Sequence, residues 1–177
     1  TAYTSDLRAE PNVLFRGTPN GRFVEIDPKG GTTQTLIHSS RGTAVGDIDN
    51  DGGLDLLVVN RDGPAYVLMN RVSERGNWVR FKVLLHEGRD AHGARVTAMI
   101  GSNKITRRVQ PEGSYLDSND PRVHFGLSTE SRIRDVEVRW PTGKTEVFGN
   151  FNAGGTVYLR EGEGTVRRID APKPVTP

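Results

Sequence analysis

The feature that most constrains the fold of this 177-residue chain is an alternation of apolar and polar residues with a period of two. Within residues 78–85, Val79 and Phe81 fall on one side of an extended chain, whereas Arg80 and Lys82 fall on the other. Such alternation is typical of half-buried strands. We find no 12-residue window with the apolar stripe of an amphipathic helix. The sequence therefore predicts an all-β chain, and it places Arg80 and Lys82 on a solvent-facing side.

Turn-forming residues separate many short segments of this kind. The chain contains 21 Gly and 10 Pro residues, a content that favours turn-rich β structure. Beside the segment at 78–85, the predicted strands are residues 13–16, 22–26, 43–48, 54–60, 65–70, 94–100, 104–110, 122–126, 136–140, 145–148, 155–160 and 165–169.

Composition excludes several classes of protein. The chain has no cysteine, which removes disulfides, thiolate metal sites and cysteine nucleophiles. No apolar run approaches the ~20 residues of a membrane-spanning helix. The net charge of +2 is too small for the basic stripe of a nucleic-acid-binding protein. We expect no membrane insertion and no nucleic-acid partner.

One loop concentrates acidic side chains. Asp47, Asp49, Asp51 and Asp55 occupy positions 1, 3, 5 and 9 of a nine-residue segment, and the carbonyl of Gly53 stands at position 7. At ~5 Å and an effective dielectric constant of ~20, each pair of carboxylates repels by about 3 kcal/mol, so we expect a bound cation to neutralise them. Oxygen ligands in a flexible loop suit Ca²⁺. The segment predicts a calcium site.

The loop has two alternative interpretations. A solvated acidic turn without a metal ion remains open. An EF-hand is excluded because position 12 is Val58 rather than Glu, and because the flanks 43–45 and 56–59 are strand-like rather than helical.

The chain divides into segments of different character. We predict a propeller-like segment at 1–71, a second β domain at 77–165 and a flexible Pro-rich tail at 166–177. Residues 13–24 and 67–79 resemble each other at an offset of roughly 54, near the repeat length of propeller blades. This repeat predicts two outer strands of one blade in 13–27 and three inner strands of the next in 43–70. With no Met at position 1, we expect the chain to be a processed form or an excised piece.

Two family resemblances follow from these motifs. Residues 42–70, with the aspartate loop, resemble an FG-GAP/VCBS-type calcium-loop propeller blade. Residues 77–160 resemble the ASPIC/UnbV domain, on the segments 90–96 (DAHGARV), 113–116 (GSYL), 123–127 (VHFGL) and 136–143 (VEVRWPTG).

The resemblance implies a C-terminal fragment: partial propeller blades with a calcium loop, followed by an antiparallel β-sandwich-like ASPIC/UnbV domain. It also implies a secreted or periplasmic calcium-binding protein with an adhesive or interaction role toward a protein or glycan, and no established catalytic residues. The alternative is the C-terminal part of a β-propeller enzyme whose active site lies in absent blades.

The remaining candidate residues are weaker. The Gly143-Lys144-Thr145 segment lacks the earlier glycine of a phosphate-binding loop and predicts a hairpin turn. His124 is expected on a strand with its ring hydrogen-bonded, and 117–121 is expected to be a turn, with a second cation loop as the alternative. A further hypothesis assigns binding of an acidic polysaccharide to four basic residues, Arg107, Arg108, Arg132 and Arg134.

Overall fold

A computed structural model of the chain describes residues 7–61, 63–72 and 76–166, and within these the chain forms two compact units. Unit 1 contains residues up to 46, residues 54–70 and residues 113–118; unit 2 contains residues 47–53, 71–112 and 119 onward. The loop 47–53 thus groups with unit 2, although the strands on either side of it belong to unit 1.

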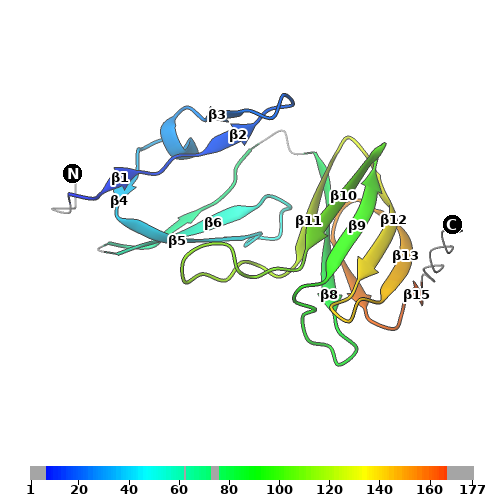
Figure 1. Cartoon of the computed structure of the whole chain (residues 1–177). Coiled ribbons are helices and arrows are strands. Elements are labelled where there is room, and N and C mark those ends of the chain that lie inside the picture. The colour runs from blue at the N-terminus through cyan, green and yellow to red at the C-terminus, as the bar shows by residue number, and fades with distance from the viewer. Residues whose placement is uncertain (1–6, 62, 73–75, 167–177) are drawn as a thin grey trace, which may run out of the picture. The chain divides into compact units, whose positions relative to one another are not determined.

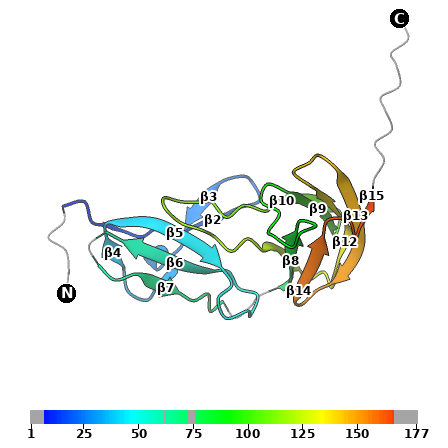
Figure 2. The ribbon, with the colours of Figure 1, turned by 90° about the horizontal axis from the view of Figure 1, so that it is seen from below.

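Unit 1 consists of three small sheets, visible at the blue and cyan end of the chain in Figure 2. Strands β1 (Glu10–Pro11) and β4 (Ile37–His38) pair with each other, as do β2 (Phe15–Gly17) and β3 (Phe23–Glu25). The third sheet is an antiparallel meander of β5 (Ser40–Gly46), β6 (Asp55–Asn60) and β7 (Tyr66–Leu68). The three-residue 3₁₀ helix η1 (Lys29–Gly31) follows β3.

Unit 1 leaves much of its apolar surface exposed. Phe15 is 54% exposed, Phe23 is 74% exposed and Val67 is 55% exposed. Its buried side chains are largely polar. The ring of His38 is hydrogen-bonded to the hydroxyl of Tyr66, and the side-chain oxygen of Asn60 accepts a hydrogen bond from the hydroxyl of Ser40 at 2.8 Å. Polar contacts rather than a large apolar core therefore hold the strands of this unit in register.

Unit 2 is built from two sheets (Figure 1). The five-stranded sheet has the order β10 (Asn103–Arg108), β9 (Arg95–Ile100), β12 (Arg132–Arg139), β13 (Thr145–Asn152), β15 (Thr165–Val166). The three-stranded sheet has the order β11 (Val123–Ser128), β8 (Asn77–Leu84), β14 (Thr156–Arg160).

The inward faces of these two sheets share one hydrophobic core. From the smaller sheet, Val79 and Phe81 are fully buried together with Phe125, whose ring meets that of Phe81 edge-on at 5.8 Å between centroids. From the larger sheet, Val96 and Val138 are fully buried. Side chains at alternating positions of each strand fill the space between the sheets, which is the packing of a β-sandwich.

The all-β prediction is confirmed, since every segment predicted as a strand contains one in the part of the chain that the structure describes. The short β1 and β4 were not predicted, because two-residue strands carry no alternation. The expected antiparallel sandwich needs one correction: β14 runs parallel to β8. The chain crosses from β13 in one sheet to β14 in the other, so these consecutive strands do not pair with each other.

The 54-residue repeat is not reproduced as a repeated hairpin. Residues 13–24 contain the β2–β3 hairpin, but the second copy contributes β7 to one sheet and β8 to another. The two strands predicted within 13–27 correspond to the β2–β3 sheet, and the three predicted within 43–70 correspond to the β5–β6–β7 sheet. The predicted tail 166–177 lies, beyond Val166, outside the described residues. Among those residues the longest helical segment has three residues, far too few to cross a membrane.

Candidate metal centre

The aspartate loop is the turn between β5 and β6, and its ends are held together by the pairing of Gly46 with Asp55. The turn reverses through Asn50 and Gly52, whose φ angles are 60° and 91°. An added Cβ at Gly52 would lie 1.9 Å from the indole Nε1 of Trp78. Glycine is therefore required at position 52 both by the backbone conformation and by the close approach of this ring.

The loop brings three of the predicted ligands together. Asp47, Asp49 and Asp55 each offer a carboxylate oxygen, and these oxygens lie within 4.8 Å of one another. Residues Asp47 and Asp55 are buried, with 2% and 1% of their surface exposed. Oxygen donors at this spacing fit a hard divalent cation such as Ca²⁺.

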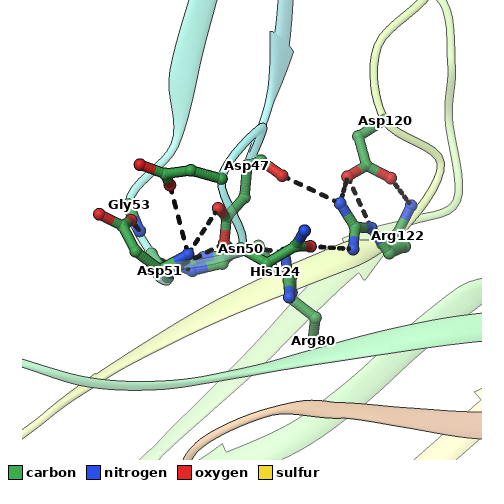
Figure 3. Close-up of polar contacts among 10 residues, drawn as sticks. Asp47, Asn50, Asp51, Gly53, Arg80, Asp120, Arg122 and His124 are labelled. Atoms are coloured by element: carbon green, nitrogen blue, oxygen red, sulfur yellow. Dashed lines mark hydrogen bonds and ion pairs between the residues drawn. The ribbon is translucent and has the colours of Figure 1, made fainter. Parts of the chain in front are cut away.

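Asp51 is not part of that group. Its Oδ1 accepts the backbone N–H of Gly53 at 2.8 Å, which closes a tight Asx turn inside the loop (Figure 3). Asp55 also has a structural partner, since its Oδ1 accepts the N–H of Asn70 at 2.8 Å. Asp51 and the carbonyl of Gly53 remain predicted ligands.

Both carboxylate oxygens of Asp47 accept hydrogen bonds. Its Oδ1 accepts the N–H of Asp51 at 3.1 Å, and its Oδ2 accepts the N–H of Gly52 at 2.8 Å. Oδ2 also accepts Nη1 of Arg80 at 2.8 Å, and the two side chains are 0% and 4% exposed. Asp47 thus organises the loop and anchors it to β8.

The loop meets further basic groups of unit 2 (Figure 3). Arg122 donates to the side chain of Asn50 at 2.9 Å and to the carbonyl of Asp47 at 3.2 Å. His124 Nε2 donates to the carbonyl of Gly52 at 3.0 Å, and its ring stacks on Trp78. The prediction that the ring of His124 is hydrogen-bonded is confirmed.

Burial, neighbouring charges and hydrogen bonds shift the pKa values of these basic groups. Desolvation and the nearby Arg122 lower the pKa of Arg80, and the carboxylate of Asp47 acts in the opposite direction. Hydrogen bonding to Asp120 raises the pKa of Arg122, so this side chain stays cationic. Burial lowers the pKa of His124, which favours a neutral ring with its proton on Nε2.

These contacts show that basic side chains of the protein already neutralise part of the loop's negative charge. A cation was expected to be the neutralising partner of the crowded carboxylates, but the protein supplies its own: Arg80 pairs with Asp47, and Arg71 lies 3.2 Å from Asp49. Sequence reasoning missed Arg80 because alternation placed it on an outward face. The loop 47–53 covers that face, and nothing in the local pattern of β8 indicates this.

The structure also shows the surroundings of two weaker candidate segments, 143–145 and 117–121. Gly143, with φ of 91°, lies in the turn of the β12–β13 hairpin, as predicted, and Lys144 forms an ion pair with Glu146 rather than part of a phosphate-binding loop. The expected turn at 117–121 is instead an irregular segment, and the turn lies just before it, at residues 115–116. In this segment Asp117 accepts the N–H of Ser114, and Asp120 is engaged with Arg122.

Comparison with known proteins gives a family match mainly within unit 2. The family model described as "ASPIC and UnbV" matches residues 85–166. This chain contains an ASPIC and UnbV domain. The match extends from the end of β8 to β15 and therefore covers most of the unit 2 sandwich.

Over most of its length the chain is homologous to cartilage acidic protein 1. It is 34% identical to the Xenopus tropicalis protein over 161 residues, which is 82% of this chain and 24% of that protein. It is also 34% identical to the human protein over 138 residues, 75% of this chain and 20% of that protein. The chain thus spans about a quarter or less of the length of these curated relatives, and the alignments reach beyond the ASPIC and UnbV domain.

Proposed function

We propose that this chain is a non-catalytic extracellular interaction module that binds Ca²⁺ at the loop 47–55. The observation that carries the proposal is the convergence of oxygens from Asp47, Asp49 and Asp55. The donors are all oxygen, the loop is tightly turned, and each of the three carboxylates already accepts a backbone N–H group. Such preorganisation lowers the entropic cost of collecting the ligands.

The role of the ion would be structural. Ca²⁺ would neutralise the charge that Arg80 and Arg71 leave uncompensated and would hold β5 and β6 at their shared turn. The oxygens of Asp47 would be shared between the ion and the loop's own N–H donors. Extracellular calcium modules commonly bind with dissociation constants of roughly 10⁻⁴–10⁻³ M, and we expect an affinity in this range.

We also propose that β2–β3 and β5–β6–β7 belong to FG-GAP/VCBS-type propeller blades. The β5–β6–β7 meander with an acidic loop after its first strand supports this, as does the large exposed fraction of Phe15, Phe23 and Val67. Isolated blades cannot bury their faces, and neighbouring repeats would cover such side chains.

The proposed location is outside the cytoplasm, secreted or periplasmic. The relatives carry cartilage in their name, and we extend an extracellular setting from them to this chain. Detection of the natural protein in the culture medium or periplasmic fraction would agree with this, whereas recovery only with cytoplasmic markers would contradict it.

Calorimetric titration tests the metal site directly. Calcium chloride is titrated into the chelator-treated chain and into the variants Asp49→Ala/Asp51→Ala and Asp49→Asn. We expect saturable binding to the natural chain and none to the double variant at millimolar Ca²⁺. Asp135→Asn removes an exposed carboxylate from β12 and serves as the matched control. Equal binding by all four proteins would refute the site.

A further inference from the structure

The outward face of the five-stranded sheet carries a continuous basic surface that the sequence shows only in part. In β9, Val96 and Ala98 point into the core, so Arg95, Thr97 and Met99 point outward. The register then places the outward side chains of β10 and β12 beside them. We call the resulting set the basic face; its cations are Arg95, Lys104, Arg108, Arg132, Arg134 and Arg139, all of them exposed.

Three arginines form a row across neighbouring strands. Arg95 pairs in register with Arg108 of β10 on one side and with Arg139 of β12 on the other (Figure 1 shows these strands side by side). Residues paired directly across strands have Cβ atoms about 4.5–5.5 Å apart and share one face of the sheet. Like charges directly opposite each other destabilise a sheet. The arginine row therefore does not contribute to folding stability, which suggests another role.

Little negative charge offsets this surface. On the three strands that carry the basic face, the acidic residues are Asp135 and Glu137, and Glu137 lies 3.7 Å from Lys104. Arg132 and Arg134 donate to uncharged oxygens, the side chain of Asn152 and the carbonyl of Gly101. Within the part of the chain that the structure describes, no carboxylate lies within ion-pair distance of Arg95, Arg108 or Arg139.

The residues between the cations indicate the kind of partner. The outward positions next to the arginine row are Thr97, Thr106 and Glu137. The hydroxyls of the two threonines lie 2.9 Å apart, and Glu137 faces Lys104. Within β9, β10, β12 and β13 the outward positions carry no aromatic side chain. Sites for single-stranded nucleic acids usually combine basic grooves with stacking aromatics, and duplex grooves are read by protruding helices or β-ribbons. The centres of protein interfaces are enriched in aromatic side chains, which this face lacks.

We propose that the basic face binds a linear anionic polysaccharide through its sulfate or carboxylate groups. Arginine forks match both groups in bidentate geometry, and threonine hydroxyls can donate to and accept from sugar hydroxyls. The proposal rests on the interaction role proposed above and specifies its partner. Of the four arginines in the sequence hypothesis, Arg108, Arg132 and Arg134 belong to the face. Arg107 points the other way, and its guanidinium lies 5.6 Å from the ring centre of Phe125.

The test measures the affinity of the whole chain for heparin at low salt, with dextran and a DNA duplex of matched charge as comparison polymers. Arg95→Ser/Arg139→Ser removes two members of the row, and Arg16→Ser/Arg22→Ser removes the same charge from exposed positions in unit 1. Unfolding temperatures confirm that each variant is folded. We expect the first variant to lose about tenfold or more in heparin affinity and the second to lose less than about twofold. Arg95→Lys/Arg139→Lys should be intermediate, because lysine keeps the charge without the fork.

Three results would overturn the proposal: no heparin binding by the natural chain, equal losses in both serine variants, or DNA binding as tight as heparin binding. The calcium-site proposal can be tested separately from the proposal for the basic face. Asp49→Asn should leave heparin affinity unchanged, so heparin binding without calcium binding refutes only the metal proposal, and calcium binding without heparin binding refutes only this one.

Discussion

Asp47 and Arg80 form a buried ion pair, with Oδ2 and Nη1 2.8 Å apart and side chains 0% and 4% exposed. The pair joins the first carboxylate of the acidic loop to the middle of β8. Burial of two charges is tolerated because backbone N–H groups of the loop also bind Asp47. This contact determines where the loop lies in unit 2.

Replacement of Arg80 should therefore be costly. Arg80→Met leaves Asp47 buried without its counter-charge, and we expect a loss of about 3–5 kcal/mol in the free energy of unfolding. Lys82→Met, two residues along the same strand, breaks an ion pair with Asp90 in which the two side chains are 26% and 27% exposed, and should cost about 1 kcal/mol. Urea denaturation of both variants measures the difference. Equal losses would contradict the special role of Arg80.

Gly52 and Gly143 separate backbone strain from steric exclusion, because both have φ of 91°. Gly143→Ala adds a Cβ with no atom within 4 Å, so only the left-handed conformation opposes it, at about 1–2 kcal/mol. Gly52→Ala also drives the Cβ into Trp78, and we expect a loss of about 3 kcal/mol or more. Thermal unfolding compares the two. A similar cost at both positions would show that the Trp78 contact is easily displaced.

Calcium should stabilise the chain by mass action. At a free Ca²⁺ concentration ten times the dissociation constant, the free energy of unfolding should rise by about 1.4 kcal/mol. This increment should vanish in Asp49→Asn and persist in Asp135→Asn. Denaturation in calcium and in chelator provides the measurement, and magnesium at the same concentration controls for ionic strength.

Arg71 should compete with the metal ion, because its guanidinium lies 3.2 Å from Asp49 and 4.0 Å from Asp51. Its side chain is 69% exposed, so solvent weakens the competition. We expect Arg71→Ser to tighten calcium binding about two- to fivefold. Arg16→Ser makes the same change of net charge away from the loop. If both variants tighten binding equally, the effect is one of overall charge.

Glu146 should contribute to the acid sensitivity of the fold. Burial raises the pKa of this carboxyl, but hydrogen bonds from Lys144 and the backbone of Gly162 lower it, and the balance lies below the ordinary value. The folded state therefore favours the ionised form. Its stabilising contribution is complete above the unfolded pKa of about 4.3 and is lost as the pH falls through the lower, folded value.

Glu146→Gln should accordingly flatten the fall in the free energy of unfolding between about pH 4.3 and lower pH. Glu163→Gln, an exposed carboxylate in the turn before β15, provides the control and should leave the slope unchanged. Denaturation curves from pH 3 to pH 7 give both slopes. An unchanged slope in Glu146→Gln would contradict the assignment.

Local patterns predicted the strands well because alternation is a property of a single strand. In β8 the alternating residues Val79, Phe81 and Val83 already show which side faces the core, and all three lie in it. The aspartate spacing likewise predicted a loop in which carboxylates converge, and Asp47, Asp49 and Asp55 do so. Asp51 could not be placed in this way, because the choice between a ligand position and an Asx turn depends on the backbone of the loop itself.

Relations between strands could not be predicted from local patterns. Alternation assigned Arg80 to solvent, but a face is solvated only if no other segment covers it, and the loop 47–53 covers this one. Arg95 and Arg139 lie 44 positions apart in the chain and become neighbours only through the register of β9 and β12. Likewise, Arg107 and Arg108 are adjacent in sequence but lie on opposite faces of β10.

The sequence by itself determined that the chain is β-rich, where its strands begin and end within a few residues, and which loop collects acidic side chains. These properties depend on residues close together in the chain, where backbone geometry relates spacing to direction. Only the tertiary structure decided which cation pairs with Asp47, which arginines form a row and which way β14 runs. Those depend on strand order, register and coverage, which arise from packing between segments far apart in the chain.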